Sequence, residues 1–271
     1  MTYLGFLIGF VLMPILLLLV WMQFDKKAKK LGSQISKNMQ LVFSFIILTS
    51  LALLYTTPWD NYLVATGVWW YDADKVSGII LGWVPLEEYL FFVLQPILGG
   101  LILLLVFARR TDNHGERLIP AARSVGISIA LLVWLAALAF LILGIPGATY
   151  LGLELIWAVP VVMLQLAFGA DILWKYRRLL IGVILGLTIY LSIADAIAIQ
   201  SGVWTIDPQQ SSGLLLGGML PIEEFIFFLL TNIMVGFGFL LIWAPESHAR
   251  LVDIKNKLST SRQIHDLGKE P

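Results

Sequence analysis

Seven long apolar stretches constrain this chain more than any other feature, because each is long enough to cross the ~30 Å hydrocarbon core of a bilayer as a helix. They lie near residues 3–24, 39–57, 79–107, 123–144, 150–172, 179–199 and 214–243. Hydrophobic residues make up 59% of the 271-residue chain and charged residues only 13%, well below the roughly 25% of a soluble domain. We therefore predict an all-α, polytopic membrane protein with seven transmembrane helices, and the lipid bilayer is its first expected partner.

The basic residues predict how the chain is oriented. They gather between the first and second, the third and fourth, and the fifth and sixth stretches, and after the seventh; Lys75 alone falls on the opposite side. By the positive-inside rule, the amino terminus is outside and the carboxyl terminus is cytoplasmic, in the cell membrane. No basic residue precedes the first stretch and a lysine cluster follows it, so we expect a spanning helix there and not a cleaved signal peptide.

Two segments of the chain are near-copies of each other. Each contains Ser-Gly, an apolar run, a Pro-x-Glu-Glu motif and aromatic residues, and the motifs are Pro85-Leu86-Glu87-Glu88 and Pro221-Ile222-Glu223-Glu224. Trp69 corresponds to Trp204, and Asp60 to Asp195, at an offset of 135, whereas the glutamates correspond at an offset of 136 after a slip of one residue.

The duplication extends over most of the chain, since Pro14 corresponds to Pro160 at an offset of 146. We predict two parallel three-helix repeats, residues 1–107 and 150–243, that face each other across a central cavity. Residues 108–149 would form a cytoplasmic loop and a connecting helix, and 244–271 a cytoplasmic polar tail.

The paired glutamates are the candidate catalytic residues: Glu87, Glu88, Glu223 and Glu224. A charged group at the centre of a spanning helix costs about 2.5 kcal/mol or more, so four acids in apolar sequence suggest proton chemistry on an apolar substrate. Burial and a like-charged neighbour would leave one carboxyl of a pair protonated and the other ionised, as general acid and base roles require.

A structural interpretation of the motif stays open beside the catalytic one. Proline is favoured at the first position of a helix and acids in its first turn, so Pro-x-Glu-Glu also describes a plain helix start at the interface. Consecutive helical residues point about 100° apart. If the pairs are buried, one member of each contacts the substrate and its neighbour supports it.

Aromatic side chains surround the motifs and are the candidate substrate-binding residues: Trp83, Tyr89, Phe91, Phe92, Phe225, Phe227, Phe228, Trp69 and Trp204. Ring faces stabilise cations, so acids among rings suit carbocation chemistry; an aromatic belt and helix packing are the alternative. Pro85, Pro221, Asp60 and Asp195 are expected to support the site, although the two aspartates equally fit ordinary interface positions. Glu154 has no counterpart in the duplication, and we expect it at the interface.

Several chemistries are excluded by what the sequence lacks. The last stretch, 214–243, has no lysine for a retinal Schiff base, and Lys75 alone cannot balance a diphosphate on the outer face. No G-x-G-x-x-G motif indicates a dinucleotide fold, and without cysteine there is no thiolate metal site. We therefore expect redox-neutral chemistry with neither metal nor cofactor; a cofactor held in a way that the sequence does not reveal is the alternative.

The duplicated Pro-x-Glu-Glu motif with its aromatic residues resembles that of the lycopene cyclase domain family. These are integral-membrane, non-flavoprotein carotenoid cyclases of bacteria and archaea, related to the cyclase part of fungal bifunctional enzymes; here the two repeats look fused. The resemblance implies that the four glutamates convert the linear ends of lycopene to β-ionone rings, giving β-carotene, by acid–base carbocation cyclisation.

The resemblance also implies the partners. They are lycopene or a related linear carotenoid, with other carotenoid-pathway enzymes as further candidates and no nucleic acid. Two alternatives stay open: a proton- or cation-coupled transporter with carboxylate pairs at the repeat interface, and a carotenoid-binding scaffold that depends on a partner for chemistry.

Overall fold

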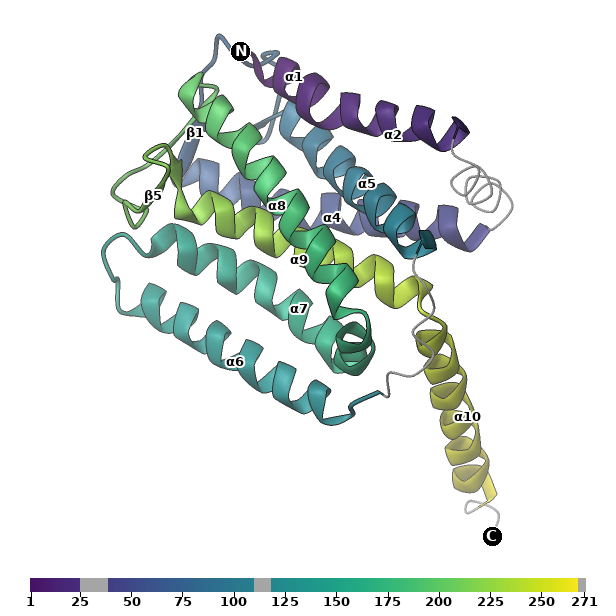
Figure 1. The fold of residues 1–271 in the computed structure, drawn as a ribbon. Helices are drawn as coiled ribbons and strands as arrows, with labels where there is room; N and C mark the ends of the chain where they lie inside the picture. Colours follow the sequence, from purple (N-terminus) through teal and green to yellow (C-terminus); the bar gives the residue numbers. More distant parts are fainter. Residues whose placement is uncertain (25–38, 110–117, 268–271) are drawn as a thin grey trace.

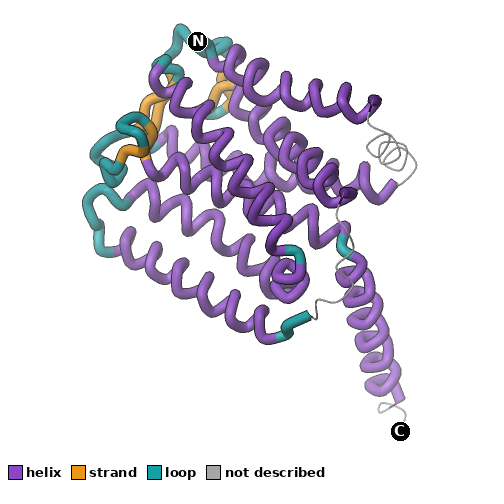
Figure 2. The backbone as a smooth tube through the Cα atoms, viewed as in Figure 1, coloured by secondary structure: helices purple, strands orange, loops and turns teal. Residues whose placement is uncertain are grey.

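The computed structural model describes residues 1–24, 39–109 and 118–267, and this part of the chain is mainly helical (Figures 1 and 2). Seven of its helices are long and apolar enough to cross a membrane, which confirms the predicted fold class. The first is built from α1 (Tyr3–Phe6), the π-helix η1 (Leu7–Leu12) and α2 (Met13–Phe24). The others are α4 (Met39–Ala65), α5 (Leu86–Arg109), α6 (Ala121–Ile142), α7 (Thr149–Lys175), α8 (Arg177–Gln200) and α9 (Ile222–Trp243).

Two helices begin later than the hydropathy predicts. The runs expected to open helices 79–107 and 214–243 fold instead as β-hairpins, β2 (Ile80–Leu81) with β3 (Val84–Pro85) and β5 (Leu215–Leu216) with β6 (Leu220–Pro221). Glycines at positive φ make the turns, Gly82 in the first hairpin and Gly217 and Gly218 in the second. The second turn holds one residue more, which is the one-residue slip between the duplicated segments.

A short antiparallel ladder joins the two duplicated halves. Strand β1 (Trp69–Tyr71) pairs with β4 (Trp204–Ile206), with Tyr71 opposite Trp204 and Trp69 opposite Ile206. The Asp72 amide donates to the Val203 carbonyl and the Asp207 amide donates to the Val68 carbonyl, which extends the ladder on both sides. Trp69 and Trp204 therefore both lie in strands of this ladder.

The two ends of the bundle differ in character. The hairpins and the amino terminus lie together at one end, called the hairpin end below, and helix α10 (Pro245–Leu267) leaves from the opposite end (Figure 1). The predicted polar tail is thus helical over most of its length. It is tied back to α7, because Arg250 forms an ion pair with Asp171 at 2.5 Å and Glu246 with Lys175 at 2.7 Å.

Many of the basic residues that predict the orientation of the chain lie outside the described residues. The lysine cluster between the first two helices, together with Arg110 and Arg117, lies in segments 25–38 and 110–117. The inside–outside assignment of the two ends therefore stays a prediction.

Helices α5 and α9 pack against each other in the centre of the bundle, and a glycine sets their spacing. A Cβ added at Gly100 of α5 would lie 2.6 Å from ring atoms of both Phe239 and Phe45, which belong to α9 and α4. At the neighbouring Gly99 the nearest atom, from Val235, would be 3.4 Å away, an ordinary contact. Position 100 therefore requires a hydrogen as its side chain, whereas position 99 tolerates a methyl group.

This contrast gives a stability prediction with a matched control. Gly100→Ala should destabilise the purified protein by about 1–3 kcal/mol relative to Gly99→Ala, because overpacking a tight interface forces side chains off their preferred rotamers. Both changes bring the same gain in helix propensity. Thermal unfolding in detergent measures the difference, and equal melting temperatures for the two variants would contradict this packing.

Candidate active site

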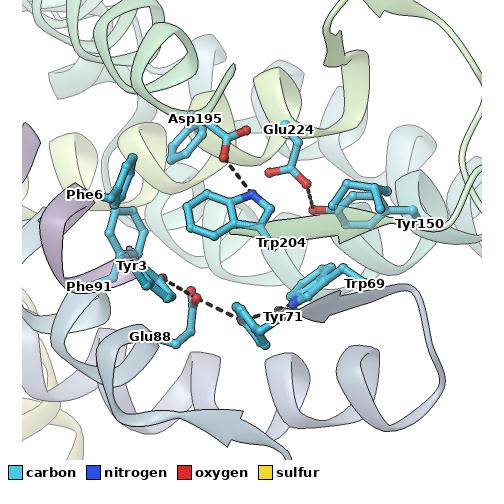
Figure 3. A pocket seen from close by; sticks show the side chains of 12 residues that line it. Tyr3, Phe6, Trp69, Tyr71, Glu88, Phe91, Tyr150, Asp195, Trp204 and Glu224 are labelled. Atoms are coloured by element: carbon cyan, nitrogen blue, oxygen red, sulfur yellow. Dashed lines mark hydrogen bonds between the residues drawn. The ribbon is translucent and has the colours of Figure 1, made fainter. Parts of the chain in front are cut away.

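A cavity of about 40 Å³ lies at the hairpin end, between the two duplicated halves (Figure 3). Each half contributes six of the residues that line it. They are Tyr3, Phe6, Trp69, Tyr71, Glu88 and Phe91 from the first half, and Tyr150, Asp195, Trp204, Ile206, Glu224 and Phe228 from the second. The site is therefore assembled from α1, α5, α7, α8 and α9 and the β1–β4 ladder, with one motif glutamate from each half.

Glu88 enters the cavity from the first half and is held by two phenols. The Tyr71 hydroxyl donates to Glu88 Oε2 at 2.9 Å, and the Tyr3 hydroxyl donates to the same oxygen. The indole N–H of Trp69 in turn donates to the Tyr71 oxygen at 3.1 Å. Burial raises the pKa of the Tyr71 phenol, as do the Asp60 and Glu88 carboxyls, so Tyr71 stays a neutral donor at physiological pH.

Glu224 enters the cavity from the second half with a different set of partners. The Tyr150 hydroxyl donates to Glu224 Oε1 at 2.8 Å. Asp195 lies nearby and accepts from the Trp204 indole N–H at 3.0 Å, and the Trp204 ring lies between the two sides of the cavity (Figure 3). The position that corresponds to Tyr71 is Ile206, so Glu224 lacks a second strand phenol.

The first glutamate of each motif faces away from the cavity and fastens a hairpin. Glu87 accepts from the Ser77 backbone N–H at 2.6 Å and from its hydroxyl at 3.0 Å. Glu223 accepts from the Ser212 backbone N–H at 2.6 Å. Both are buried, with 2% and 0% of their surface exposed. The motif is therefore a helix start whose first acid is buried, because the hairpin covers the first helical turn.

The aromatic residues singled out from the sequence separate into three groups. Trp69, Phe91, Trp204 and Phe228 line the cavity. Phe92 and Phe227 are buried in the core and Phe225 is partly buried outside the cavity lining. Tyr89 donates to the Leu81 carbonyl and so braces the first hairpin. Trp83, at the tip of that hairpin, is 63% exposed.

The proposed supporting residues occupy different places. Pro85 and Pro221 end strands β3 and β6, directly before the glutamate helices. Asp195 lines the cavity, whereas Asp60 is buried outside the lining, and its Oδ2 has no hydrogen-bond partner among the described residues.

Tyr3, Phe6, Tyr71 and Tyr150 are site residues that the sequence reasoning missed. Tyr3 and Tyr150 correspond at an offset of 147, one more than the offset of Pro14 and Pro160. The first helix thus holds one extra residue between its tyrosine and its proline, and the π-helix η1 accommodates it. A search that allowed this slip would have matched the two tyrosines.

Glu154 corrects an expectation. It is not at an interface but fully buried on α7, and neither carboxyl oxygen has a hydrogen-bond partner among the described residues. Its lack of a counterpart in the duplication led to the wrong placement. Across the described ranges, no group of three or more His, Asp or Glu side chains is arranged to hold a metal ion.

Comparison with known proteins decides the family. The family model described as lycopene cyclase matches residues 1–107 and 123–242. This chain belongs to the lycopene cyclase family. A lycopene beta-cyclase of Halobacterium salinarum is 40% identical over 196 residues, which cover 72% of this chain and 80% of that protein.

Fungal members of the lycopene cyclase family match more distantly. A bifunctional lycopene cyclase/phytoene synthase of Arthroderma gypseum is 31% identical over 236 residues, 81% of this chain and 39% of the fungal protein. The corresponding Leptosphaeria maculans protein is 33% identical over 209 residues, 73% of this chain and 35% of its own length. No solved structure matches the chain.

The glutamate contacts predict that each first motif glutamate stabilises the hairpin of its own half and not the other hairpin. Glu87→Ala should speed amide exchange of residues 77–85 about tenfold or more, because a buried N–H that loses its acceptor costs about 1–3 kcal/mol. Residues 212–221 serve as the internal control, and Glu223→Ala should reverse the pattern. Hydrogen–deuterium exchange with mass spectrometry reads both hairpins at once, and equal acceleration of both by either change would contradict the assignment.

Proposed function

We propose that this protein is a lycopene β-cyclase that closes the linear ends of lycopene into β-ionone rings, giving β-carotene. One observation carries the proposal: Glu88 and Glu224, one from each duplicated motif, line the same small cavity among aromatic rings. Membership of the lycopene cyclase family and the Halobacterium salinarum relative support the substrate.

The first step protonates the substrate, and we assign it to Glu224. It accepts one phenol hydrogen bond, from Tyr150. As a protonated acid it would deliver its proton to C2 of the terminal C1=C2 double bond, which leaves a tertiary cation at C1 and a Glu224 carboxylate. The fixed Tyr150 donor then stabilises that carboxylate.

Ring closure follows within the aromatic part of the cavity. The electron pair of the C5=C6 double bond forms the C1–C6 bond, and the positive charge moves to C5. Ring faces stabilise such a cation electrostatically, and Phe6, Phe91, Trp204 and Phe228 supply them. An apolar wall also keeps water from adding to the cation.

The last step removes a proton from C6, and we assign it to Glu88. Two phenol donors suit a carboxylate acceptor, so Glu88 is built as the base. Loss of that proton forms the C5=C6 double bond of the β-ring. One proton enters and one leaves, with no net oxidation, and the Glu88 proton must return to Glu224 before the next turnover.

The cavity has to widen for this reaction. At about 40 Å³ it has room for only a few water molecules, so the substrate end must push the lining rings apart. We place the site in the outer half of the cell membrane, with the amino terminus outside and the carboxyl terminus cytoplasmic, from the distribution of basic residues. The matching hairpins and glutamate contacts support the proposal of two parallel repeats.

The transporter alternative lacks comparable support. The relatives reported above carry cyclase names, and none is named as a transporter. A scaffold that depends on a partner for chemistry would lead purified protein to bind lycopene without converting it. We expect the purified chain to convert lycopene unaided, with other carotenoid-pathway enzymes as suppliers of substrate.

The division of labour within each motif is testable in a lycopene-accumulating host. Glu224→Gln should leave lycopene unconverted and Glu88→Gln should abolish β-carotene, each lowering formation at least 1000-fold, because each removes a proton-transfer step. Glu87→Gln and Glu223→Gln keep an acceptor for the serine N–H and should retain a tenth or more of the activity. Chromatographic pigment profiles measure this. Were the Glu88 and Glu224 variants still to make β-carotene, the catalytic assignment would be wrong.

Tyr71 gives a graded test of the base. Tyr71→Phe removes one of the two phenol donors to Glu88 and should lower kcat about 10- to 100-fold with little change in KM, because a charge-assisted hydrogen bond contributes about 1.5–3 kcal/mol. Tyr62→Phe, an exposed tyrosine on α4, is the control and should behave as wild type. A larger change in KM than in kcat would contradict a role confined to the base.

A further inference from the structure

An apolar groove of about 660 Å³ runs along the bundle beyond the catalytic cavity. Three helices wall it: α2, α5 and α8. Leucine, isoleucine and valine side chains make up most of the lining, with Trp21 near its far end. Gly182 and Gly186 form its floor on α8, and a Cβ added at either would meet nothing within 4 Å. Two missing side chains on one helix face thus leave a furrow.

The groove lies further along the same helices than the cavity. On α5, Phe91 lines the cavity and Leu98 and Val106 line the groove, at ~1.5 Å of rise per residue. On α8, Asp195 lines the cavity, and Tyr190, about 7.5 Å along the axis, lines the near end of the groove. The first spanning helix contributes in the same order, with Phe6 in the cavity and Pro14 and Leu18 in the groove.

The counterpart helices on the other side of the cavity carry an aromatic stack. There Trp157 stacks on Trp59 with ring centroids 4.3 Å apart, Phe227 stacks on Trp59 at 5.9 Å, and Tyr55 stacks on Trp157 at 6.0 Å. These rings join α4, α7 and α9, the counterparts of α8, the first spanning helix and α5. An aromatic stack therefore fills the space between α4, α7 and α9 beside the cavity.

One pair of matching contacts relates the two regions. Tyr55 donates to the Trp157 carbonyl at 2.8 Å, and Tyr190, its counterpart at an offset of 135, donates to the Phe10 carbonyl at 2.9 Å. At the same offset, Trp59 corresponds to Ala194. Ala194 is itself buried and lies outside the groove lining. The two glycines of the groove floor, Gly182 and Gly186, correspond at this offset to Ile47 and Leu51, so α4 carries aliphatic side chains where α8 has none.

We propose that this groove binds the polyene chain of the linear carotenoid while its reacting end lies in the cavity. The inference rests on the proposed function, and it adds a substrate-binding site and a direction of approach between the first spanning helix, α5 and α8. The ligand is a long unsaturated hydrocarbon, which suits an aliphatic furrow. The Tyr190 hydroxyl donates to the Phe10 carbonyl, so the aromatic ring of Tyr190 is the part that faces the groove.

Substitutions that fill the groove test the proposal. Gly182→Leu and Gly186→Leu should each lower kcat/KM for lycopene at least tenfold, mainly through KM. A short acyclic analogue that keeps the reacting end but lacks the rest of the polyene should react as with wild type. Ala136→Leu, which adds bulk at an exposed position of α6 away from the groove, is the control. Unchanged lycopene kinetics, or an equal loss with both substrates, would overturn the proposal.

A binding measurement separates this inference from the proposed function. The Glu88→Gln/Glu224→Gln protein, purified from lycopene-accumulating cells, should retain lycopene, read by its absorption, and adding Gly186→Leu should reduce the retained pigment at least fivefold. If the Gly186→Leu protein retained as much lycopene as its parent, the groove assignment would be wrong even in a functioning cyclase. It would also be wrong if native mass spectrometry of the protein without this change showed a bound phospholipid that lycopene does not displace. A wild-type chain that binds lycopene in the groove but never cyclises it would instead refute the proposed function.

Discussion

The four motif glutamates depend on hydrogen-bond donors from other parts of the protein, because neither lipid nor apolar side chains supply them. Most of the local architecture meets this need. The hairpins bring the Ser77 and Ser212 amides over the first helical turns, where Glu87 and Glu223 accept from them. The first spanning helix, α7 and strand β1 bring the phenols that hold Glu88 and Glu224. Without these donors, the glutamate helices could not begin below the surface of the bundle.

The spans were predictable because a long apolar run has few folds open to it in a membrane. Their starts at α5 and α9 were not, since the runs before Pro85 and Pro221 are as apolar as the helices that follow. What distinguishes them is glycine, which permits the positive φ of Gly82, Gly217 and Gly218. Hydropathy does not register that freedom, so the hairpins were taken for helix.

The candidate site was predictable in part for a similar reason. The motif pointed to paired acids, and helical geometry indicated that only one member of each pair could face the cavity, but which one depends on where the hairpin closes. Tyr3, Tyr71 and Tyr150 escaped notice because a tyrosine near the end of an apolar helix is also an ordinary interface residue. Glu154 was misplaced because an unpaired acid in a duplicated sequence looked incidental.

The duplicated halves have diverged where the substrate would pass. One extra residue in the first spanning helix is absorbed by η1, Ile206 stands where the other half has Tyr71, and Ala194 where it has Trp59. These differences give the two carboxyls unlike partners and surround the cavity with unlike side chains on its two sides. The duplication thus gives two halves with similar backbones, in which the corresponding glutamates have different partners and different proposed roles.

A cavity assembled jointly by both halves also limits how a symmetrical molecule is processed. Lycopene has two identical termini, but the two motifs converge on one chamber instead of forming a chamber each. A doubly cyclised product therefore requires two successive visits, with the singly closed compound withdrawn, turned end for end and readmitted. The balance between monocyclic and bicyclic pigment then depends on how fast that compound leaves and how well its closed end is rejected.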